Sequence, residues 1–310
     1  TGPGGLVPPD EGDVALVVHT SGTTGAPRPV ELSFGNIQAN AFGSAVALGL
    51  DPAERWLCPL PLSHVGGLMV LLRSAIYGTT AVLGGLDRIG DVTLASLVPT
   101  QLRRVLDAGV APGPRLRAIL LGGAGADRAL LTRSHALGWR VAPTYGLTQA
   151  CSQVTVAEPG DTETCGRPLP GVRVAIAPDG EILVDGPTVA GGGTLHTGDL
   201  GRLDDRGRLI VIGRKADTIV TGGENVSPAE VEAVLLEHPA VADAGVFGRR
   251  DPEWGEAVTA RVVLHAPATE EELRAWVAGR LARFKVPKAI EVADVLPRTG
   301  SGKLLRRELA

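Results

Sequence analysis

Short apolar runs, often rich in β-branched residues, alternate with longer segments of helical spacing through the first 150 residues of the chain. The runs at 14–18, 79–85, 94–99, 115–123 and 139–146 are bounded by glycine, proline or polar residues, as strands are. Such alternation predicts an α/β fold of parallel sheets in which ligands bind where the strands end. The run VALVV at 14–18 is expected to be a buried strand.

The helical segments between these runs have recognisable ends. Ser33 is a favoured N-cap, and Gly49 follows the end of the first predicted helix. Helices are predicted over 33–48, 65–77, 100–109 and 127–138.

After residue 162 the pattern changes to short alternating runs joined by Asp-Gly and Arg-Gly turns, at 171–187 and 201–214. This spacing predicts a subdomain rich in β-hairpins. From about Lys215 onward, strands and helices form a compact α+β module. We therefore expect a large domain over 1–213, a connecting segment over 214–217 and a small domain over 218–310.

The bulk composition limits the classes of function. Apolar residues make up 44% of the chain and charged residues 21%, as in globular proteins, and the formal net charge is −4. A nucleic-acid-binding protein needs a basic face, so this charge argues against one. The sequence predicts neither a membrane span nor a secretory leader. Three cysteines without metal-ligand spacing fit a reducing compartment, and we expect a cytoplasmic protein.

The segment HTSGTTGAPRPV, from His19 to Val30, carries hydroxyls and glycines directly after an apolar run. Hydroxyl groups and glycine-exposed amides suit phosphate oxygens. The spacing differs from that of the G-x-x-x-x-G-K-[ST] phosphate loop. From its composition alone, the segment fits a phosphate site and a plain polar turn equally well.

Three further motifs combine a tight turn with a residue able to bind a nucleotide. Tyr145, in TYGLTQA, fits two interpretations: its ring stacks on a base, or it is a buried tyrosine whose hydroxyl is hydrogen-bonded. Asp199, in HTGDLG, is able to bind both ribose hydroxyls or to stabilise its own turn. Lys303, in PRTGSGK, is a solvated surface lysine unless its segment swings into a site. Each motif alone is weak evidence for a site.

The order of the motifs is more specific than any one of them. Along residues 13–310 the chain carries, in order, HTSGTTGAPRPV, PLSHVGGL, LLGGA, YGLTQ, HTGDLG, GRKADTIVTGGENVSPAEVE and PRTGSGKLLRREL. In this order it resembles the acyl-adenylate-forming (AMP-binding) superfamily, which includes acyl-CoA synthetases, luciferases and peptide-synthetase adenylation domains. The resemblance implies a large domain, a small mobile C-terminal domain, and ATP-dependent ligation of an acid to a thiol. It also implies Mg²⁺ as cofactor and coenzyme A as co-substrate.

The resemblance implies roles for residues at matching positions. Lys303 would bridge the acyl carboxylate and the α-phosphate, Thr148 would bind the α-phosphate, and His64 would border the acyl pocket and the path of the thiol. The simpler alternative for His64 is a hydrogen-bonded helix cap. The small domain would turn at Lys215–Ala216 between the two half-reactions, withdrawing Lys303 and bringing in residues 221–228. The nucleotide would be bound by Thr20, Ser21, Gly22, Thr23, Thr24, Gly25, Gly123, Ala124, Tyr145, Gly146, Asp199 and Arg214.

Three features depart from the family pattern. Arg28 and Pro29 stand where the family usually has Lys-Gly, which keeps a positive charge but removes an N–H. Gln149 stands where the family usually has a glutamate that binds Mg²⁺, so we expect weaker metal binding there and slower adenylation. The first motif begins close to Thr1, so we expect a chain that is shortened at this end relative to the family. The acyl site would then be more open or completed by a second subunit, which keeps a homo-oligomer as an alternative.

Arg73 lies in the otherwise apolar segment HVGGLMVLLRSAIYG, nine residues after His64. A buried guanidinium without an anion is costly, so Arg73 is expected to meet a protein carboxylate, a helix end, solvent or a second carboxylate on the substrate. This spacing, with LASLVPTQLRRVL, YGLTQACSQVT and GRPLPGVRV, resembles the o-succinylbenzoate–CoA ligases of menaquinone synthesis. Arg73 would then hold the aryl carboxylate of the acid. The acyl site would include His64, Arg73, Gly122, Ser152 and Gln153.

The predicted function is therefore the ATP-dependent conversion of o-succinylbenzoate to its CoA thioester, with the acid, ATP and CoA as partners. One alternative is a CoA or carrier-protein ligase for another aryl or fatty acid. Another is a catalytically degenerate nucleotide-binding homologue. Gln149 and the shortened N-terminal part would be consistent with this alternative.

Overall fold

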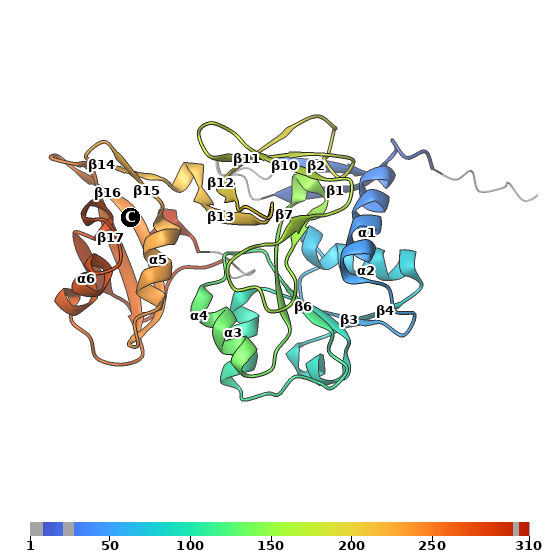
Figure 1. Cartoon of the computed structure of the whole chain (residues 1–310), viewed down its shortest axis with the longest axis horizontal. Helices are drawn as coiled ribbons and strands as arrows, with labels where there is room; N and C mark the ends of the chain where they lie inside the picture. The colour runs from blue at the N-terminus through green and yellow to red at the C-terminus, as the bar shows by residue number, and fades with distance from the viewer. Residues whose placement is uncertain (1–8, 21–27, 300–303, 310) are drawn as a thin grey trace, which may run out of the picture.

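The computed structural model describes residues 9–20, 28–299 and 304–309 of the 310-residue chain. Figure 1 shows a larger part, coloured blue to yellow, and a smaller part in orange and red. The 3₁₀ turn η3 (Lys215–Asp217) lies where the two parts join. Within the described residues, no helix is both long enough and apolar enough to span a membrane.

A seven-stranded sheet, in the order β4-β3-β5-β6-β7-β8-β9, forms the centre of the larger part. Its first five strands pair in parallel, as predicted, whereas β8 pairs antiparallel with β7 and β9. Strand β3 was not predicted from the sequence. The strands are β3 (Arg55–Cys58), β4 (Thr80–Leu83), β5 (Leu94–Leu97), β6 (Ala118–Leu121), β7 (Val141–Leu147), β8 (Ser152–Val156) and β9 (Arg167–Pro168).

Alternate side chains of the parallel strands pack against helices on opposite faces of this sheet, as the two-residue period of a strand requires. Leu57 and Ile119 pack with residues of α3 and α4, whereas Trp56 and Leu120 pack with residues of α1 and α2. The helical elements of this part are α1 (Phe34–Leu48), α2 (Val65–Tyr77), η1 (Leu86–Asp91), α3 (Pro99–Asp107), α4 (Arg128–Ala136) and η2 (Thr148–Ala150).

The helix ends agree with the local sequence signals. Ser33 caps α1, because its Oγ accepts a hydrogen bond from the backbone N of Asn36 at 3.1 Å. Gly49 ends the same helix with a φ of +74°, a conformation that favours glycine. Helix α3 begins at Pro99, one residue before its predicted start, because proline suits the first helical position.

The strand predicted at 14–18 is present, but the prediction that it is buried is wrong. Strand β1 (Val14–Thr20) pairs with β2 (Arg28–Ser33) in a two-stranded antiparallel sheet. Val14 and Val17 are 52% and 50% exposed, whereas Val18 is buried. In the described part of the chain, β1 pairs with β2 alone, so no strand lies along its other edge.

The hairpin-rich subdomain is present as predicted. It is a four-stranded antiparallel sheet in the order β10-β11-β12-β13, and it lies above the seven-stranded sheet in Figure 1. The strands are β10 (Arg173–Ile176), β11 (Glu181–Asp185), β12 (Leu195–Leu203) and β13 (Leu209–Arg214).

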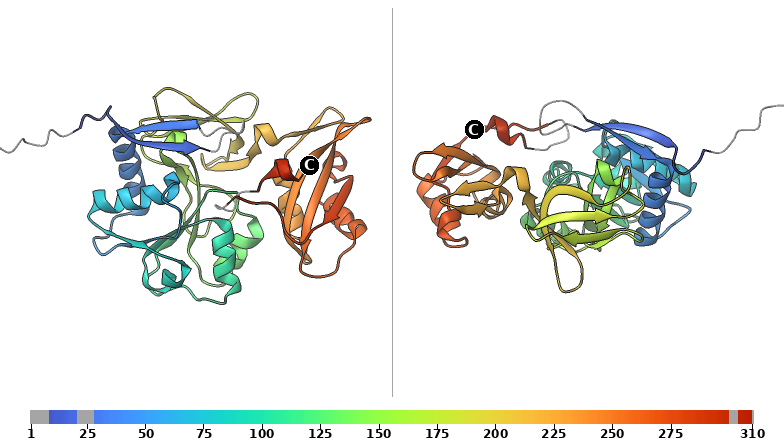
Figure 2. Two further views of the ribbon diagram at one scale, coloured as in Figure 1. Left: turned by 180° about the vertical axis from the view of Figure 1, so that it is seen from behind. Right: turned by 90° about the horizontal axis from the view of Figure 1, so that it is seen from above.

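The smaller part is a five-stranded sheet with two helices and its own apolar core. In both views of Figure 2, its C-terminal turn η5 lies on the side that faces the larger part. The elements are β14 (Ile219–Thr221), β15 (Glu224–Val226), α5 (Pro228–Leu236), β16 (Val241–Asp251), β17 (Gly255–Leu264), α6 (Glu270–Ala278), η4 (Arg283–Lys285), β18 (Ala289–Val292) and η5 (Arg306–Glu308).

Candidate active site

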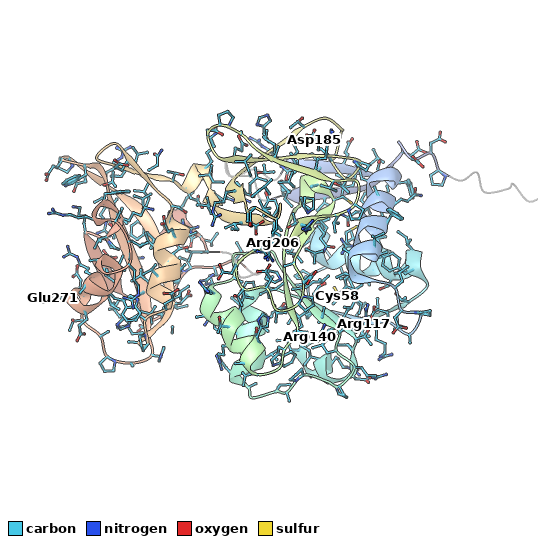
Figure 3. The ribbon with its side chains drawn as sticks, viewed as in Figure 1. Cys58, Arg117, Arg140, Asp185, Arg206 and Glu271 are labelled. Atoms are coloured by element: carbon cyan, nitrogen blue, oxygen red, sulfur yellow. The ribbon has the colours of Figure 1, made fainter. Side chains whose placement is uncertain are left out.

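The carboxyl ends of β6 and β7 lie side by side, because these strands are parallel neighbours. Gly122 directly follows β6, and Tyr145 and Gly146 lie near the end of β7. Figure 3 labels Arg117 and Arg140, the residues just before these strands, in the lower part of the molecule. The strands therefore run from there toward the hairpin subdomain, and their carboxyl ends meet it.

Backbone crowding explains the glycines at these strand ends. A Cβ atom at Gly122 would lie 2.6 Å from Oγ1 of Thr144, and one at Gly146 would lie 1.8 Å from the carbonyl oxygen of Ser152. Gly123 has a φ of +77°, which is unfavourable for other residues. The exposed Ala124 follows it. Larger residues would displace the backbone that approaches this edge.

Three predicted nucleotide-binding residues form one cluster at this edge. The Tyr145 hydroxyl donates a hydrogen bond to Oδ2 of Asp199 at 2.8 Å, and Nε of Arg214 lies 3.0 Å from Oδ1 of Asp199. Strands β12 and β13 place Asp199 opposite Arg214. Burial raises the pKa of the Tyr145 hydroxyl, and the negative charge of Asp199 raises it further. Tyr145 therefore remains a donor to the carboxylate at neutral pH.

Glu181 supports the same cluster, although the sequence analysis did not select it. Its Oε1 accepts a hydrogen bond from the backbone N of Gly198 at 2.9 Å, beside Asp199. Its Oε2 lies 3.4 Å from both Nδ1 of His196 and Nζ of Lys215. The hydrogen bond from Gly198 lowers the pKa of Glu181, and His196 and Lys215 lower it further. In the sequence, Glu181 is a glutamate that follows an Asp-Gly turn. That local pattern does not indicate its hydrogen bond with Gly198.

The turn after β7 has an uncommon backbone. Cys151 and Ser152 have φ values of 53° and 87°, and non-glycine residues rarely adopt positive φ. The turn is held by hydrogen bonds from the Cys151 N to the Thr148 carbonyl at 3.0 Å and from the Ala190 N to the Gln149 carbonyl at 2.8 Å. The side chain of Gln149 is exposed beyond this turn. Strained backbone of this kind is often found at functional sites.

Arg73 lies in a buried polar cluster between α1, α2 and β8. It is 3% exposed, its Nη2 donates a hydrogen bond to Oδ1 of Asn40, and its guanidinium carbon lies 5.7 Å from the ring centre of Trp56. Nδ2 of Asn40 donates to the carbonyl oxygen of Gln153 at 2.8 Å. Burial lowers the pKa of Arg73. Bulk solvent is therefore excluded as its partner, and among the described residues it forms no ion pair with a carboxylate.

This cluster retains unused hydrogen-bonding groups. Nε of Arg73 and both Nε2 and Oε1 of Gln153 have no hydrogen-bond partner among the described residues. Buried polar atoms are normally paired, so unpaired ones indicate a ligand or water. Arg73 and Gln153 had been assigned to one acyl site, and the structure does bring them together through Asn40, which the sequence analysis missed.

His64 does not join this cluster. It occupies the N-cap position of α2 with an exposed side chain that makes no capping hydrogen bond, so the simpler alternative of a side-chain cap is wrong. The reason is that its backbone carbonyl already accepts from the N–H groups of Gly67 and Leu68. Nine residues of an α-helix span about 13 Å, so Arg73 lies far along α2 from His64, one turn before the end of the helix.

Several predicted residues lie outside the described part of the chain: Ser21, Gly22, Thr23, Thr24, Gly25 and Lys303. Thr20, at the end of β1, is described, and its Oγ1 donates a hydrogen bond to the carbonyl oxygen of Arg28 at 3.2 Å.

A groove of about 1220 Å³ lies at the other end of the parallel strands, where Arg117, Arg140 and Arg206 are among its lining residues. It contains none of the predicted site residues. We place the candidate site at the carboxyl ends of the strands, because the strained turn and the Tyr145–Asp199–Arg214 cluster lie there.

Comparison with known proteins shows which family the chain belongs to. The family of AMP-binding enzymes matches residues 3–192, and the C-terminal domain of AMP-binding enzymes matches residues 230–303. The chain belongs to the AMP-binding enzymes. A 2-succinylbenzoate–CoA ligase of Bacillus subtilis (strain 168) is 40% identical to it over 331 residues, which cover 95% of this chain and 68% of the ligase.

Two solved structures of the o-succinylbenzoate CoA synthetase from Bacillus subtilis are similar to this AMP-binding enzyme. The complex with the acyl-adenylate intermediate OSB-AMP has a TM-score of 0.90 at 40% identity, over 97% of this chain and 69% of the synthetase. The complex with ATP and a magnesium ion has a TM-score of 0.89 at 40% identity, over 97% of this chain and 70% of the synthetase. The fold is thus that of an adenylate-forming ligase. The chain spans just over two thirds of the length of these relatives.

Proposed function

We propose that the chain is an ATP-dependent ligase that converts o-succinylbenzoate to its CoA thioester. In the first half-reaction, a carboxylate oxygen of the acid attacks the α-phosphorus of ATP. The bond to the pyrophosphate oxygen breaks, giving an acyl-adenylate and pyrophosphate. In the second, the CoA sulfur loses its proton and attacks the acyl carbon, and AMP leaves with the electron pair of the broken C–O bond.

The Tyr145–Asp199–Arg214 cluster carries the nucleotide part of this proposal. A carboxylate fixed by two donors is oriented to accept both ribose hydroxyls, and Arg214 is exposed enough to contact a bound nucleotide. Adenine would lie against Tyr145 beside Gly123 and Ala124. The other groups would contact phosphate: Thr148 the α-phosphate, and Thr20, Ser21, Gly22, Thr23, Thr24 and Gly25 the triphosphate.

The unpaired buried groups near Arg73 support the choice of acid. o-Succinylbenzoate carries an aryl carboxylate besides the succinyl carboxylate that is activated. The guanidinium has a free N–H and is joined through Asn40 to the backbone of Gln153, whose side-chain amide is also unpaired; the two residues would offer this second carboxylate a charged partner and a neutral donor. His64 and Ser152 would border the acyl group, and the exposure of His64 suits a residue on the path of the thiol.

Magnesium would neutralise charge on the phosphates when it is bound. Among the described residues, no group of three or more His, Cys, Asp or Glu side chains could hold a metal ion. Gln149 offers one exposed, neutral carbonyl oxygen at the carboxyl edge of the sheet. This fits Mg²⁺, which typically binds through one or two protein oxygens, substrate phosphates and water. We therefore assign Gln149 as a weak protein ligand.

The second half-reaction requires the active site to change. We assign a large domain to 1–213, a hinge to 214–217 and a small domain to 218–310. Rotation at the hinge would withdraw Lys303 and bring in residues 221–228, which form most of the β14–β15 hairpin. We place the protein in the cytoplasm, because Cys58, Cys151 and Cys165 form no disulfide. A homo-oligomer that completes the acyl site stays a prediction, which light scattering would test.

A panel of acids tests the proposed function directly. Pyrophosphate release is measured with ATP, Mg²⁺ and o-succinylbenzoate, benzoate or a fatty acid, and thioester is then measured after CoA is added. We expect o-succinylbenzoate to be the preferred acid. Preference for another acid would move the chain to the alternative ligase. Absence of pyrophosphate with every acid at high enzyme concentration would leave a nucleotide-binding protein without this activity.

Asp199→Asn is expected to weaken ATP binding while the protein stays folded. The amide keeps the shape of the side chain but loses the charge-assisted bonds, each worth about 1.5–3 kcal/mol, or roughly 10- to 150-fold in Kd. Calorimetric titration with ATP measures this change. Asp205→Asn, an exposed position in the turn between β12 and β13, is the control. Unchanged ATP affinity in a folded Asp199→Asn protein would contradict the ribose assignment.

A further inference from the structure

Each of the three guanidinium nitrogens of Arg306, in the C-terminal turn η5, has a partner. Its Nη2 lies 2.7 and 2.6 Å from the two carboxylate oxygens of Glu232. Its Nη1 donates a hydrogen bond to Oδ2 of Asp217 at 3.1 Å, and its Nε donates to the carbonyl oxygen of Val246 at 3.2 Å. The side chain is 22% exposed. Contacts from all three guanidinium nitrogens fix an arginine in one orientation.

These partners belong to different elements. Glu232 lies on α5 and Val246 on β16, which form the body of the smaller part, whereas Asp217 is the last residue of η3, in the connecting segment. Glu232 also accepts a hydrogen bond from the Val246 N at 2.8 Å. Burial raises the pKa of Glu232 and the charge of Arg306 opposes that rise, so the pair is mutually dependent. Arg306 thus ties the end of the chain to both the domain body and the hinge.

Residues just before Arg306 join the two sides of the segment that carries Lys303. Arg298 and Leu304 form an antiparallel bridge on either side of that segment, and the Leu305 N donates to the Pro297 carbonyl at 2.9 Å. Arg298 forms an ion pair with Asp243 on β16 at 2.6 Å. Arg298 and Leu304, described residues on either side of this segment, are therefore joined to each other, and Arg298 is joined to the body of the smaller part.

The opposite side of the hinge is fixed to the larger part. Nζ of Lys215 lies 2.6 Å from Oδ2 of Asp179 and 3.4 Å from Oε2 of Glu181, both in the β10–β11 hairpin region. The residues that flank Ala216 are therefore bonded to opposite parts of the chain, Lys215 to the larger and Asp217, through Arg306, to the smaller.

We propose that Arg306 is a positioning residue for adenylation. Through Glu232 and Asp217 it sets the base of the Lys303 segment relative to the hinge. Rotation at Ala216 would therefore move Asp217 and the Lys303 segment together. This inference rests on the proposed function, in which Lys303 acts in adenylation and is withdrawn before the thiol attacks. Arg306 itself contacts no substrate.

The test compares the two half-reactions in Arg306→Met and in Arg307→Met. Arg307 is the adjacent, exposed arginine and is the matched control. Pyrophosphate release reports the first step, and thioester formation from supplied acyl-adenylate and CoA reports the second. Because a displacement of about 1 Å can cost about 10²-fold in rate, we expect Arg306→Met to lower the first step by about that factor. We expect the second step, and both steps in Arg307→Met, to stay near wild type.

Two further variants separate positioning from folding. Arg306→Lys keeps the charge but has a single nitrogen, so it cannot contact Glu232, Asp217 and the Val246 carbonyl together and should restore the first step only in part. Asp217→Asn removes the charged hinge contact while the pair with Glu232 remains, and should again slow the first step alone. Equal loss of both steps in Arg306→Met would mean that Arg306 only stabilises the domain. No loss in either step would overturn the inference outright. A wild-type protein that releases no pyrophosphate with any acid would instead remove the proposed function.

Discussion

Replacing Lys303 with alanine is expected to slow formation of the acyl-adenylate by about 10²- to 10³-fold, the usual effect of removing one group that stabilises developing charge. The first half-reaction brings a carboxylate against a polyphosphate, so a cation between the two anions lowers the barrier. In the second half-reaction a thiol attacks an adenylate that has already lost pyrophosphate, and there Lys303 would be withdrawn. Thioester formation from supplied adenylate should therefore be largely kept.

The measurement uses pyrophosphate release for the first step and thioester formation for the second. Lys288→Ala is the control, because Lys288 is an exposed lysine of the same part of the chain. If Lys303→Ala lost both steps equally, the lysine would not have the adenylation role assigned to it. If neither step changed, the PRTGSGK segment would be an ordinary surface segment.

Replacing Arg73 with methionine is expected to abolish the preference for o-succinylbenzoate. Loss of a buried charged hydrogen bond to a ligand carboxylate typically costs about 2–4 kcal/mol, or roughly 30- to 900-fold in kcat/KM. Methionine keeps most of the side-chain volume within α2, so the helix should pack as before. Any turnover of benzoate, which has no second carboxylate, should be unchanged.

The comparison of two acids decides what Arg73 does. A ligand-binding role predicts loss with the diacid alone, whereas a purely structural tie between α1 and α2 through Asn40 predicts loss with both acids. Arg104→Met, on the exposed side of α3, is the control for removing an arginine from a helix. Calorimetric binding of o-succinylbenzoate to each variant gives a second readout that does not depend on turnover.

Local patterns predicted most of the elements and left out specific contacts. The Ser33 cap, the glycines at Gly49 and Gly123 and the hairpin turns are properties of a few consecutive residues, so their signals are present in the sequence. The buried-strand prediction for 14–18 failed because burial of a strand depends on which neighbours cover its two faces. Composition cannot supply that information.

The sequence by itself determined the family, the succession of strands and helices and the residue types at the strand ends, because periodicity and backbone preferences act over a few residues. Only the tertiary structure decided that Tyr145 bonds to Asp199, 54 positions away, and that Arg306 bonds to Asp217, 89 positions away. It also decided that Arg73 meets Asn40 instead of a carboxylate. Such contacts depend on sheet register and helix packing across distant segments, which no local pattern encodes.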